Sequence, residues 1–110
     1  MSTTEPKVIG LIENDRYQEL LSGVPETCGM RSGRQVIAPG SDCGEHSTGA
    51  HEEVLVVLDG QGTARLGEGT SLQIRGGQVV YIPPHTTHNI VNTGDKALRY
   101  IYVVAPIVEG

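Results

Sequence analysis

The chain has 110 residues, a formal net charge of −5 at pH 7 and an isoelectric point near 5.2, and this length suits one domain with one hydrophobic core. The acidic balance and the scattering of the eight basic residues argue against nucleic acid as a partner, because phosphate binding needs clustered Lys and Arg. No run approaches the ~20 apolar residues that cross a bilayer, and the first residues lack the apolar core of a signal peptide, so we expect a cytoplasmic protein whose partner is a small molecule.

The composition favours β-strands. The chain contains no Phe and no Trp, so its core must be built from Val, Ile and Leu, and β-branched side chains favour strands. Fifteen glycines and six prolines occur without a repeat period, as expected of tight turns between short strands. We therefore expect an all-β fold.

The N-terminal part of the chain carries the weakest signals. We expect residues 1–7 to form a flexible tail and residues 8–12 to form a strand at a sheet edge. Asn14 or Asp15 could cap a helix of one or two turns over residues 14–21, and Gly23 would suit the position after its last turn.

From residue 27 onward, short runs that could form strands alternate with Gly, Pro and Asp clusters. The runs cover residues 28–38, 44–48, 52–58, 62–66, 71–75, 78–82, 87–92 and 97–105. Their even spacing predicts a β-barrel or jelly roll. We expect hairpin turns at 59–62, 67–69 and 76–77, where glycine supplies positive φ at little steric cost.

Three of these runs, 54–58, 79–82 and 101–104, are apolar at nearly every position. Such runs indicate strands that are covered on both faces. A second copy of the chain could cover the outer face, and two well-packed sheets could do so without a partner. We expect a homodimer.

All four histidines lie in two short polar segments, each beside an apolar run. His46 and His51 belong to residues 40–60, and His85 and His88 to residues 77–92. Imidazole is the most versatile metal ligand and proton carrier among the side chains. A site can form only if the fold brings the two segments together.

Strand alternation supports such a site. Alternate residues share a face, so His51 and Glu53 point the same way, and the Pro83-Pro84 turn delivers His88 from another strand. A carboxylate converging with two or three imidazoles would suit Mn, Fe, Co, Ni, Cu or Zn and could leave coordination positions open.

The two cysteines allow several interpretations. A bridge between Cys28 and Cys43 would be worth ~3 kcal/mol in the chain-entropy model, although a reducing cytosol would keep both as thiols. Cys43 precedes His46 by three residues, so it could supply a thiolate to a soft metal. We favour two small loop or core residues.

The two polar segments resemble the paired motifs of the cupin superfamily. The first motif, G-x5-H-x-H-x3,4-E-x6-G, is matched by Gly40, His46, Glu53 and Gly60. The second motif, G-x5-P-x-G-x2-H-x3-N, is matched by Gly77, Pro83, His88 and Asn92. The resemblance implies a cupin-type β-barrel, a double-stranded jelly roll, over residues 8–110.

The resemblance implies metal ligands at His46, Glu53 and His88. Thr48, a poor ligand, stands where the family has its second histidine. We expect His51 to replace that ligand, because alternation places it on the face of Glu53. The alternative is a polar residue at the start of a strand, hydrogen-bonded to backbone or water.

Other residues are candidates for the remaining cavity wall. We expect Gln35, Thr48 and Tyr100 to bind the substrate, and Arg31, Arg34 and Arg99 could also reach the cavity. His85 replaces the glycine of the second motif, and we expect it to be a solvated loop residue. Tyr81, Tyr100 and Tyr102 lie in strands, where they could also form sheet or interface contacts.

Fold alone does not settle the activity, because barrels of this kind host dioxygenases, isomerases, epimerases, lyases and binding domains. Our leading hypothesis is a small metal-binding cupin that acts on a small organic molecule, with oxygenase-type or lyase-type chemistry. The rival hypothesis is a non-catalytic binding module with weak or no metal, which Thr48 favours. A purely structural subunit is less favoured, because polar side chains that point inward would destabilise its core.

Overall fold

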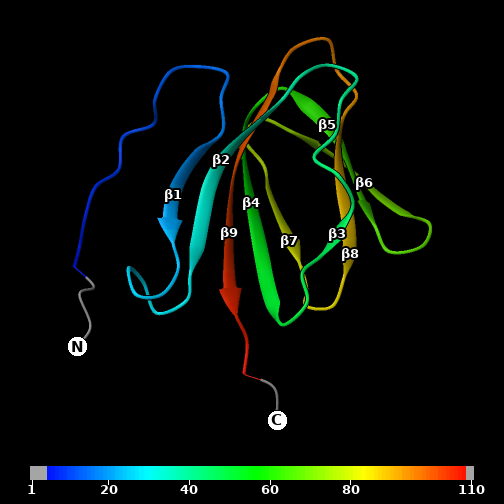
Figure 1. Cartoon of the computed structure of the whole chain (residues 1–110). Helices are drawn as coiled ribbons and strands as arrows, with labels where there is room; N and C mark the ends of the chain where they lie inside the picture. The colour runs from blue at the N-terminus through cyan, green and yellow to red at the C-terminus, as the bar shows by residue number, and fades with distance from the viewer. Residues whose placement is uncertain (1–4, 109–110) are drawn as a thin grey trace.

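The computed structural model describes residues 5–108, which form nine β-strands in two antiparallel sheets (Figure 1). The first sheet has the order β1-β2-β9-β4-β7 and the second β3-β8-β5-β6. The strands are β1 (Gln18–Ser22), β2 (Arg31–Ile37), β3 (His46–Ser47), β4 (His51–Asp59), β5 (Gln61–Leu66), β6 (Thr70–Arg75), β7 (Val79–Ile82), β8 (Thr87–Asn92) and β9 (Leu98–Pro106).

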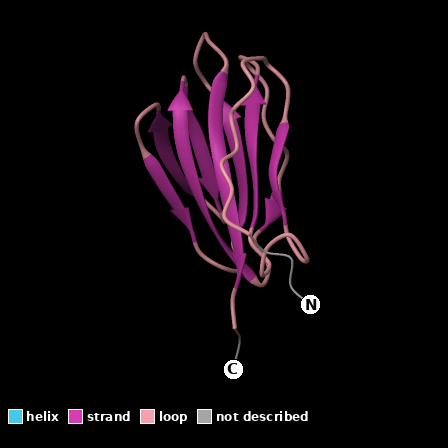
Figure 2. Cartoon of the chain, turned by 90° about the vertical axis from the view of Figure 1, so that its left-hand side faces the viewer, coloured by secondary structure: helices cyan, strands magenta, loops and turns pink. Residues whose placement is uncertain are grey.

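Figure 2 shows only strands and loops in the described part of the chain, which confirms the all-β prediction. None of these residues forms a helix that could cross a membrane. The two sheets enclose one apolar core, and its buried side chains include Ile37, Leu55, Val57, Ala64, Ile74, Val80, Ile82, Ile90, Leu98 and Tyr100. Alternation places Leu55 and Val57 of β4 in this core, whereas Val56 and Leu58 point outward.

Every run predicted after residue 27 contains a strand, but only one of the three predicted hairpin turns is correct. Residues 67–69 join the paired strands β5 and β6. The glycine turns at 59–62 and 76–77 instead carry the chain from one sheet to the other. Gly60 is required there, because it has a φ of 89° and a Cβ would lie 2.5 Å from the Ala97 carbonyl oxygen.

Two predictions for the N-terminal part are wrong. Residues 8–12 have no partner strand, and residues 14–21 contain bends followed by β1 instead of a helix. The Asn14 side chain accepts a hydrogen bond from the Arg16 N–H at 3.0 Å, so it closes an Asx turn instead of capping a helix. Pairing with β2 then fixes β1 as a strand. Of the predicted tail, residues 1–4 lie outside the described residues, and 5–7 have no regular secondary structure.

The outer face of β4 and β7 is not covered by this chain alone. Val56 and Leu58 of β4 are 36% and 41% exposed, and Val79 and Tyr81 of the edge strand β7 are 67% and 53% exposed. Two well-packed sheets therefore leave this apolar surface open.

Candidate metal centre and its cavity

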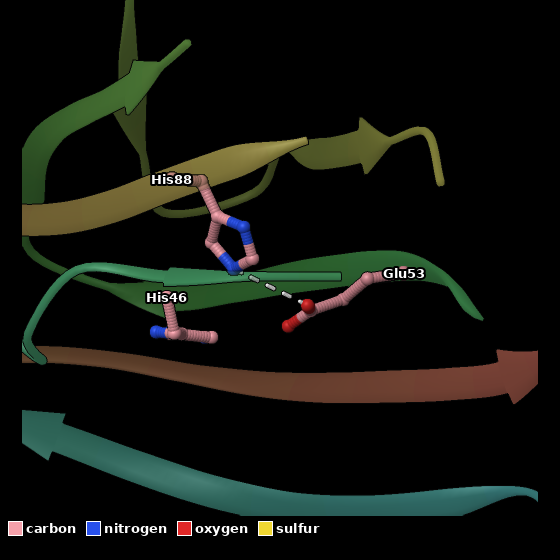
Figure 3. Close-up of side chains that lie close together, drawn as sticks. All are labelled: His46, Glu53 and His88. Carbon is pink, nitrogen blue, oxygen red and sulfur yellow. Dashed lines mark ion pairs between the residues drawn. The ribbon is translucent and has the colours of Figure 1, made fainter. Parts of the chain in front are cut away.

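Three side chains from both sheets meet at one end of the core. His46 of β3 and His88 of β8 are directly opposite residues of one antiparallel pair, with ring centroids 4.2 Å apart at an interplanar angle of 63°. Glu53 of β4 faces them from the other sheet (Figure 3). One potential ligand atom from each residue lies within 4.8 Å of the others. The positions implied by the cupin motifs therefore converge.

Backbone hydrogen bonds orient both imidazoles. Nδ1 of His46 lies 3.0 Å from the Gly44 carbonyl oxygen, and Nδ1 of His88 lies 3.1 Å from the Thr86 carbonyl oxygen. A carbonyl can only accept, so each Nδ1 carries a proton, and Nε2 has a free lone pair whenever the ring is in its neutral form. This arrangement is typical of metal-binding histidines, whose second nitrogen donates to a carbonyl or carboxylate.

Glu53 and His88 are a buried pair, 7% and 2% exposed. His88 Nε2 and Glu53 Oε1 lie 3.4 Å apart, as expected for two ligands that each lie about 2.1 Å from one tetrahedral ion. Burial lowers the pKa of His88, but the hydrogen bond to Glu53 and the bond to the Thr86 carbonyl outweigh it, so the net pKa is raised. The carboxylate would be costly to bury without an imidazole or a cation beside it, so the residues present fit a divalent metal.

The three side chains open onto a cavity of about 330 Å³. Its wall also contains the remaining predicted site residues, His51, Gln35, Thr48 and Tyr100. These residues therefore share one cavity wall, and their roles as metal ligands or substrate contacts stay predictions.

His51 lies on the cavity wall, but it is not part of the group formed by His46, Glu53 and His88. It precedes Glu53 by two residues on the same face of β4, which separates the two backbone positions by about 7 Å. Its role as a replacement ligand stays a prediction.

Thr48 is buried, and its hydroxyl is fully engaged. It donates to the Pro83 carbonyl oxygen at 2.7 Å and accepts from the Thr86 N–H at 3.0 Å. The Thr48 N–H also donates to the Thr86 carbonyl oxygen at 3.2 Å, the same oxygen that receives the His88 Nδ1 proton. Thr48 therefore ties the turn between β7 and β8 to β3 and supports the orientation of His88, and its contact with a substrate stays a prediction.

Gln35 and Tyr100 both line the cavity, and their contact with a substrate stays a prediction. The Gln35 side-chain oxygen accepts from the Val36 N–H at 3.3 Å. Tyr100 is 3% exposed and belongs to the core. Burial and then its contact with Cys43 raise the pKa of Tyr100, so the phenol stays protonated.

Both cysteines are free. Cys43 lines the cavity, and its sulfur accepts from the Ile90 N–H at 3.4 Å. It lies outside the group of three potential ligands, which agrees with a small residue at the edge of the core.

His85 explains one departure from the family motif. It is exposed in the turn between β7 and β8, with a φ of 53°. Glycine adopts this left-handed conformation most easily, which accounts for glycine in the motif, and histidine tolerates it better than most residues. Its backbone N–H donates to the Gly49 carbonyl oxygen at 2.9 Å, so the residue shapes the turn that leads to His88.

Sequence reasoning missed the tyrosine pair on the far wall. Tyr17 stacks on Tyr102 with ring centroids 6.4 Å apart, and their hydroxyls are hydrogen-bonded. Gly33 makes room for them, because a Cβ there would lie 2.4 Å from the Tyr17 hydroxyl. Arg31 and Gln35 flank Gly33 on the same face of β2 and also line the cavity. The alternation of Arg31, Gly33 and Gln35 in the sequence could have indicated this wall of the cavity. No local sequence pattern indicated that Tyr17 would lie there.

The cupin domain family Cupin_2 matches residues 33–104, which include all three potential ligands. The chain belongs to the cupin family. A glucose-6-phosphate isomerase of Pyrococcus abyssi is 37% identical over 62 residues, which cover 53% of this cupin and 33% of the isomerase. This cupin therefore spans about a third of that relative's length.

Two solved structures place the fold in the same family. A cupin 2 conserved barrel domain protein from Salinispora arenicola has a TM-score of 0.71 at 24% identity, covering 94% of this chain and 90% of its own. A predicted oxalate decarboxylase from Thermotoga maritima has a TM-score of 0.66 at 27% identity, covering 70% and 66%. The cupin has the double-stranded β-helix fold implied by its motifs.

Proposed function

We propose that this cupin holds a divalent transition metal at His46, Glu53 and His88 and acts through it on a small organic molecule bound in the cavity. The observation that carries the proposal is that one ring nitrogen of each imidazole and one buried carboxylate oxygen lie within 4.8 Å of one another. The backbone bonds at both Nδ1 atoms support it. Candidate ions are Mn, Fe, Co, Ni, Cu and Zn.

Three protein ligands leave coordination positions for substrate, water or oxygen. When bound, the ion supplies Lewis-acid or oxygen-activating chemistry, which suits an oxygenase, an isomerase or a lyase. The chain's own residues hold the site in shape: Glu53 supplies the buried negative charge, and the Gly44 and Thr86 carbonyls fix the two rings. Two similar proteins are named for reactions of small organic anions, glucose 6-phosphate and oxalate, which supports an enzyme.

Metal analysis tests the proposal directly. Protein made without a His-tag, stripped with a chelator and dialysed against each metal in turn should retain about one equivalent of at least one ion and gain thermal stability. Glu53→Gln should abolish that gain, because it removes the carboxylate ligand. Glu52→Gln is the matched control, since Glu52 is exposed on the opposite face of β4.

His51→Gln separates a three-ligand from a four-ligand site. Unchanged stoichiometry and affinity would leave three protein ligands, whereas a large loss of affinity would make His51 the fourth. Retention far below one equivalent of every ion, with no gain in thermal stability, would contradict the metal proposal.

The second candidate is a metal-free binding module. Thr48 favours it, because this residue stands at a family ligand position and its hydroxyl is already engaged with Pro83 and Thr86. In that case the stripped protein would bind its ligand without added metal, and the wild-type protein itself would gain no thermal stability from any of the ions.

A further inference from the structure

The cavity wall opposite the metal centre contains an arginine that the proposed metal site does not use. We propose that the ligand carries a second anionic group, a carboxylate or a phosphate ester, and that Arg31 binds it. This inference rests on the proposed function, because the first anchor of the ligand is the metal held by His46, Glu53 and His88.

Strand register sets the spacing between the two anchors. Glu53 on β4 pairs with Val104 on β9, and Val104 pairs with Arg31 on β2. These three residues form one row across the sheet, and Glu53, Val104 and Arg31 all line the cavity. Two strand spacings separate the backbones of Glu53 and Arg31 by about 10 Å. The ion and the two side chains fill part of that distance, which leaves room for a small molecule of roughly five carbons.

The charges of the cavity wall favour an anion. Glu53 is the single carboxylate among the described lining residues, and it already faces His88. The Arg31 guanidinium has no hydrogen bond or ion pair within the described part of the chain. Its aliphatic portion packs against Gly23, where a Cβ would lie 3.1 Å from Arg31 Cγ. Arg31 therefore presents a supported and unpaired guanidinium, whose donors match carboxylate and phosphate oxygens.

The neighbours of Arg31 do not neutralise it. Burial and then the hydrogen bond with Tyr17 raise the pKa of Tyr102, even though the charge of Arg31 acts in the opposite direction. The Tyr102 phenol therefore stays neutral and places no negative charge beside the guanidinium. Glu19 lies near this wall on β1, opposite Gly33, but it forms no ion pair with Arg31.

Calorimetry on the Co²⁺-loaded protein tests the proposal with matched pairs of probes. Glutarate is compared with its monoamide, which has the same shape and one charge less. The second pair is 3-phosphoglycerate and glycerate, which differ by the phosphate. Glutarate or 3-phosphoglycerate should bind tenfold or more tightly than the partner probe that lacks its second anionic group. The pair that shows this preference identifies the second group as a carboxylate or a phosphate ester.

Arg31→Gln should reduce that preference to less than threefold without changing the Co²⁺ content or the affinity for the monoanion. Arg31→Lys should restore part of it, and Glu19→Gln should leave it equal or larger. Arg75→Gln is the control for net charge, because Arg75 is exposed on β6 and outside the cavity. Thermal unfolding of each variant checks that it is folded.

The two levels of failure are distinguishable. Loss of Co²⁺ from the wild-type protein would overturn the proposed function and this inference together. Three results with full Co²⁺ content would overturn the role of Arg31 alone: no preference for glutarate or 3-phosphoglycerate over its partner probe, no binding of either one, or a preference that survives Arg31→Gln.

Discussion

Thr48 replaces a family metal ligand and forms a different connection to the site. Its hydroxyl bridges the Pro83 carbonyl and the Thr86 N–H, and the Thr86 carbonyl accepts the Nδ1 proton of His88. Thr48→Val keeps the shape but removes the hydroxyl, which leaves polar groups without partners at a cost of about 1–3 kcal/mol. We expect a lower free energy of unfolding in urea and a weaker affinity for metal.

Thr48→Ser is the matched control, because it keeps the hydroxyl and removes only a methyl group. It should retain most of the metal affinity. If Thr48→Val and Thr48→Ser lose the same affinity, the hydroxyl bridge does not position His88. A loss of stability with unchanged metal binding would limit Thr48 to holding the turn.

The His88–Glu53 pair predicts a pH dependence of metal binding. The pKa of His88 is raised in the metal-free fold, since the bonds to Glu53 and the Thr86 carbonyl outweigh the effect of burial. A proton on Nε2 competes with the ion, so affinity should fall as pH decreases, and the fall should begin above the ordinary histidine pKa of about 6.5. Competition with a coloured chelator at several pH values measures it, and an affinity that is constant down to about pH 5 would contradict ligation by His88.

The same pKa shift has the opposite sign for the stability of the metal-free protein. A raised pKa means that the folded state holds the His88 proton more tightly than the unfolded chain does. This contribution to stability is complete below the unfolded pKa of about 6.5 and is lost as pH rises through the raised folded value. Metal binding should therefore stabilise the protein most at the pH where this contribution has gone.

At the scale of elements, Arg34 joins the N-terminal segment to the sheet. Its side chain is buried against the outer face of β2 and donates to Asn14 Oδ1 at 3.2 Å and to the Arg16 carbonyl oxygen at 3.0 Å. The segment continues to Tyr17, which lines the cavity. Arg34 thus connects the outer surface of the sheet to the position of one cavity residue.

Arg34→Ala should loosen this segment, because Asn14 and the Arg16 carbonyl lose a charged donor. We expect faster amide hydrogen exchange in residues 11–17 and a loss of about 1–3 kcal/mol of stability, with exchange in β4 changed only by the global loss. Arg65→Ala, on an exposed position of β5, is the control. Unchanged exchange in residues 11–17 would show that other contacts hold the segment.

A strand could be predicted from the sequence where local residues determine it, and could not where it depends on residues far along the chain. Strands β2–β9 lie in runs that are bounded by Gly, Pro and Asp clusters, so local signals were sufficient. The N-terminal segment depends on distant partners instead: β1 forms on β2, and Tyr17 rests on Tyr102. A helix prediction from Asn14 used a valid local preference for accepting backbone N–H groups, but the chain uses that preference in a turn.

In the candidate site, too, some features could be predicted from local sequence and others depend on distant partners. Motif spacing placed His46, Glu53 and His88 together, because the register of β3 with β8 and the facing of two sheets are properties of the whole family fold. The role of Thr48 could not be predicted, since it depends on Pro83 and Thr86, which reach it only through the turn. The sequence named Arg31 as a residue that could reach the cavity, but it could not tell which face of β2 points inward. The pairing of β2 with β9 fixes that face.

At the scale of the whole molecule, the open apolar face of β4 and β7 predicts a homodimer. Val79 and Tyr81 are 67% and 53% exposed on an edge strand, next to the outward-facing Leu58 at 41%, and exposed apolar edge strands are sites of association. Val79→Lys should give a folded monomer, because the side chain makes little contact within its own subunit, and sedimentation velocity measures the change. Val8→Lys is the control, because Val8 is 99% exposed in the N-terminal segment, and this variant should remain dimeric. A wild-type protein that sediments as a monomer would contradict this interface. A Val79→Lys variant that stays dimeric would also contradict it.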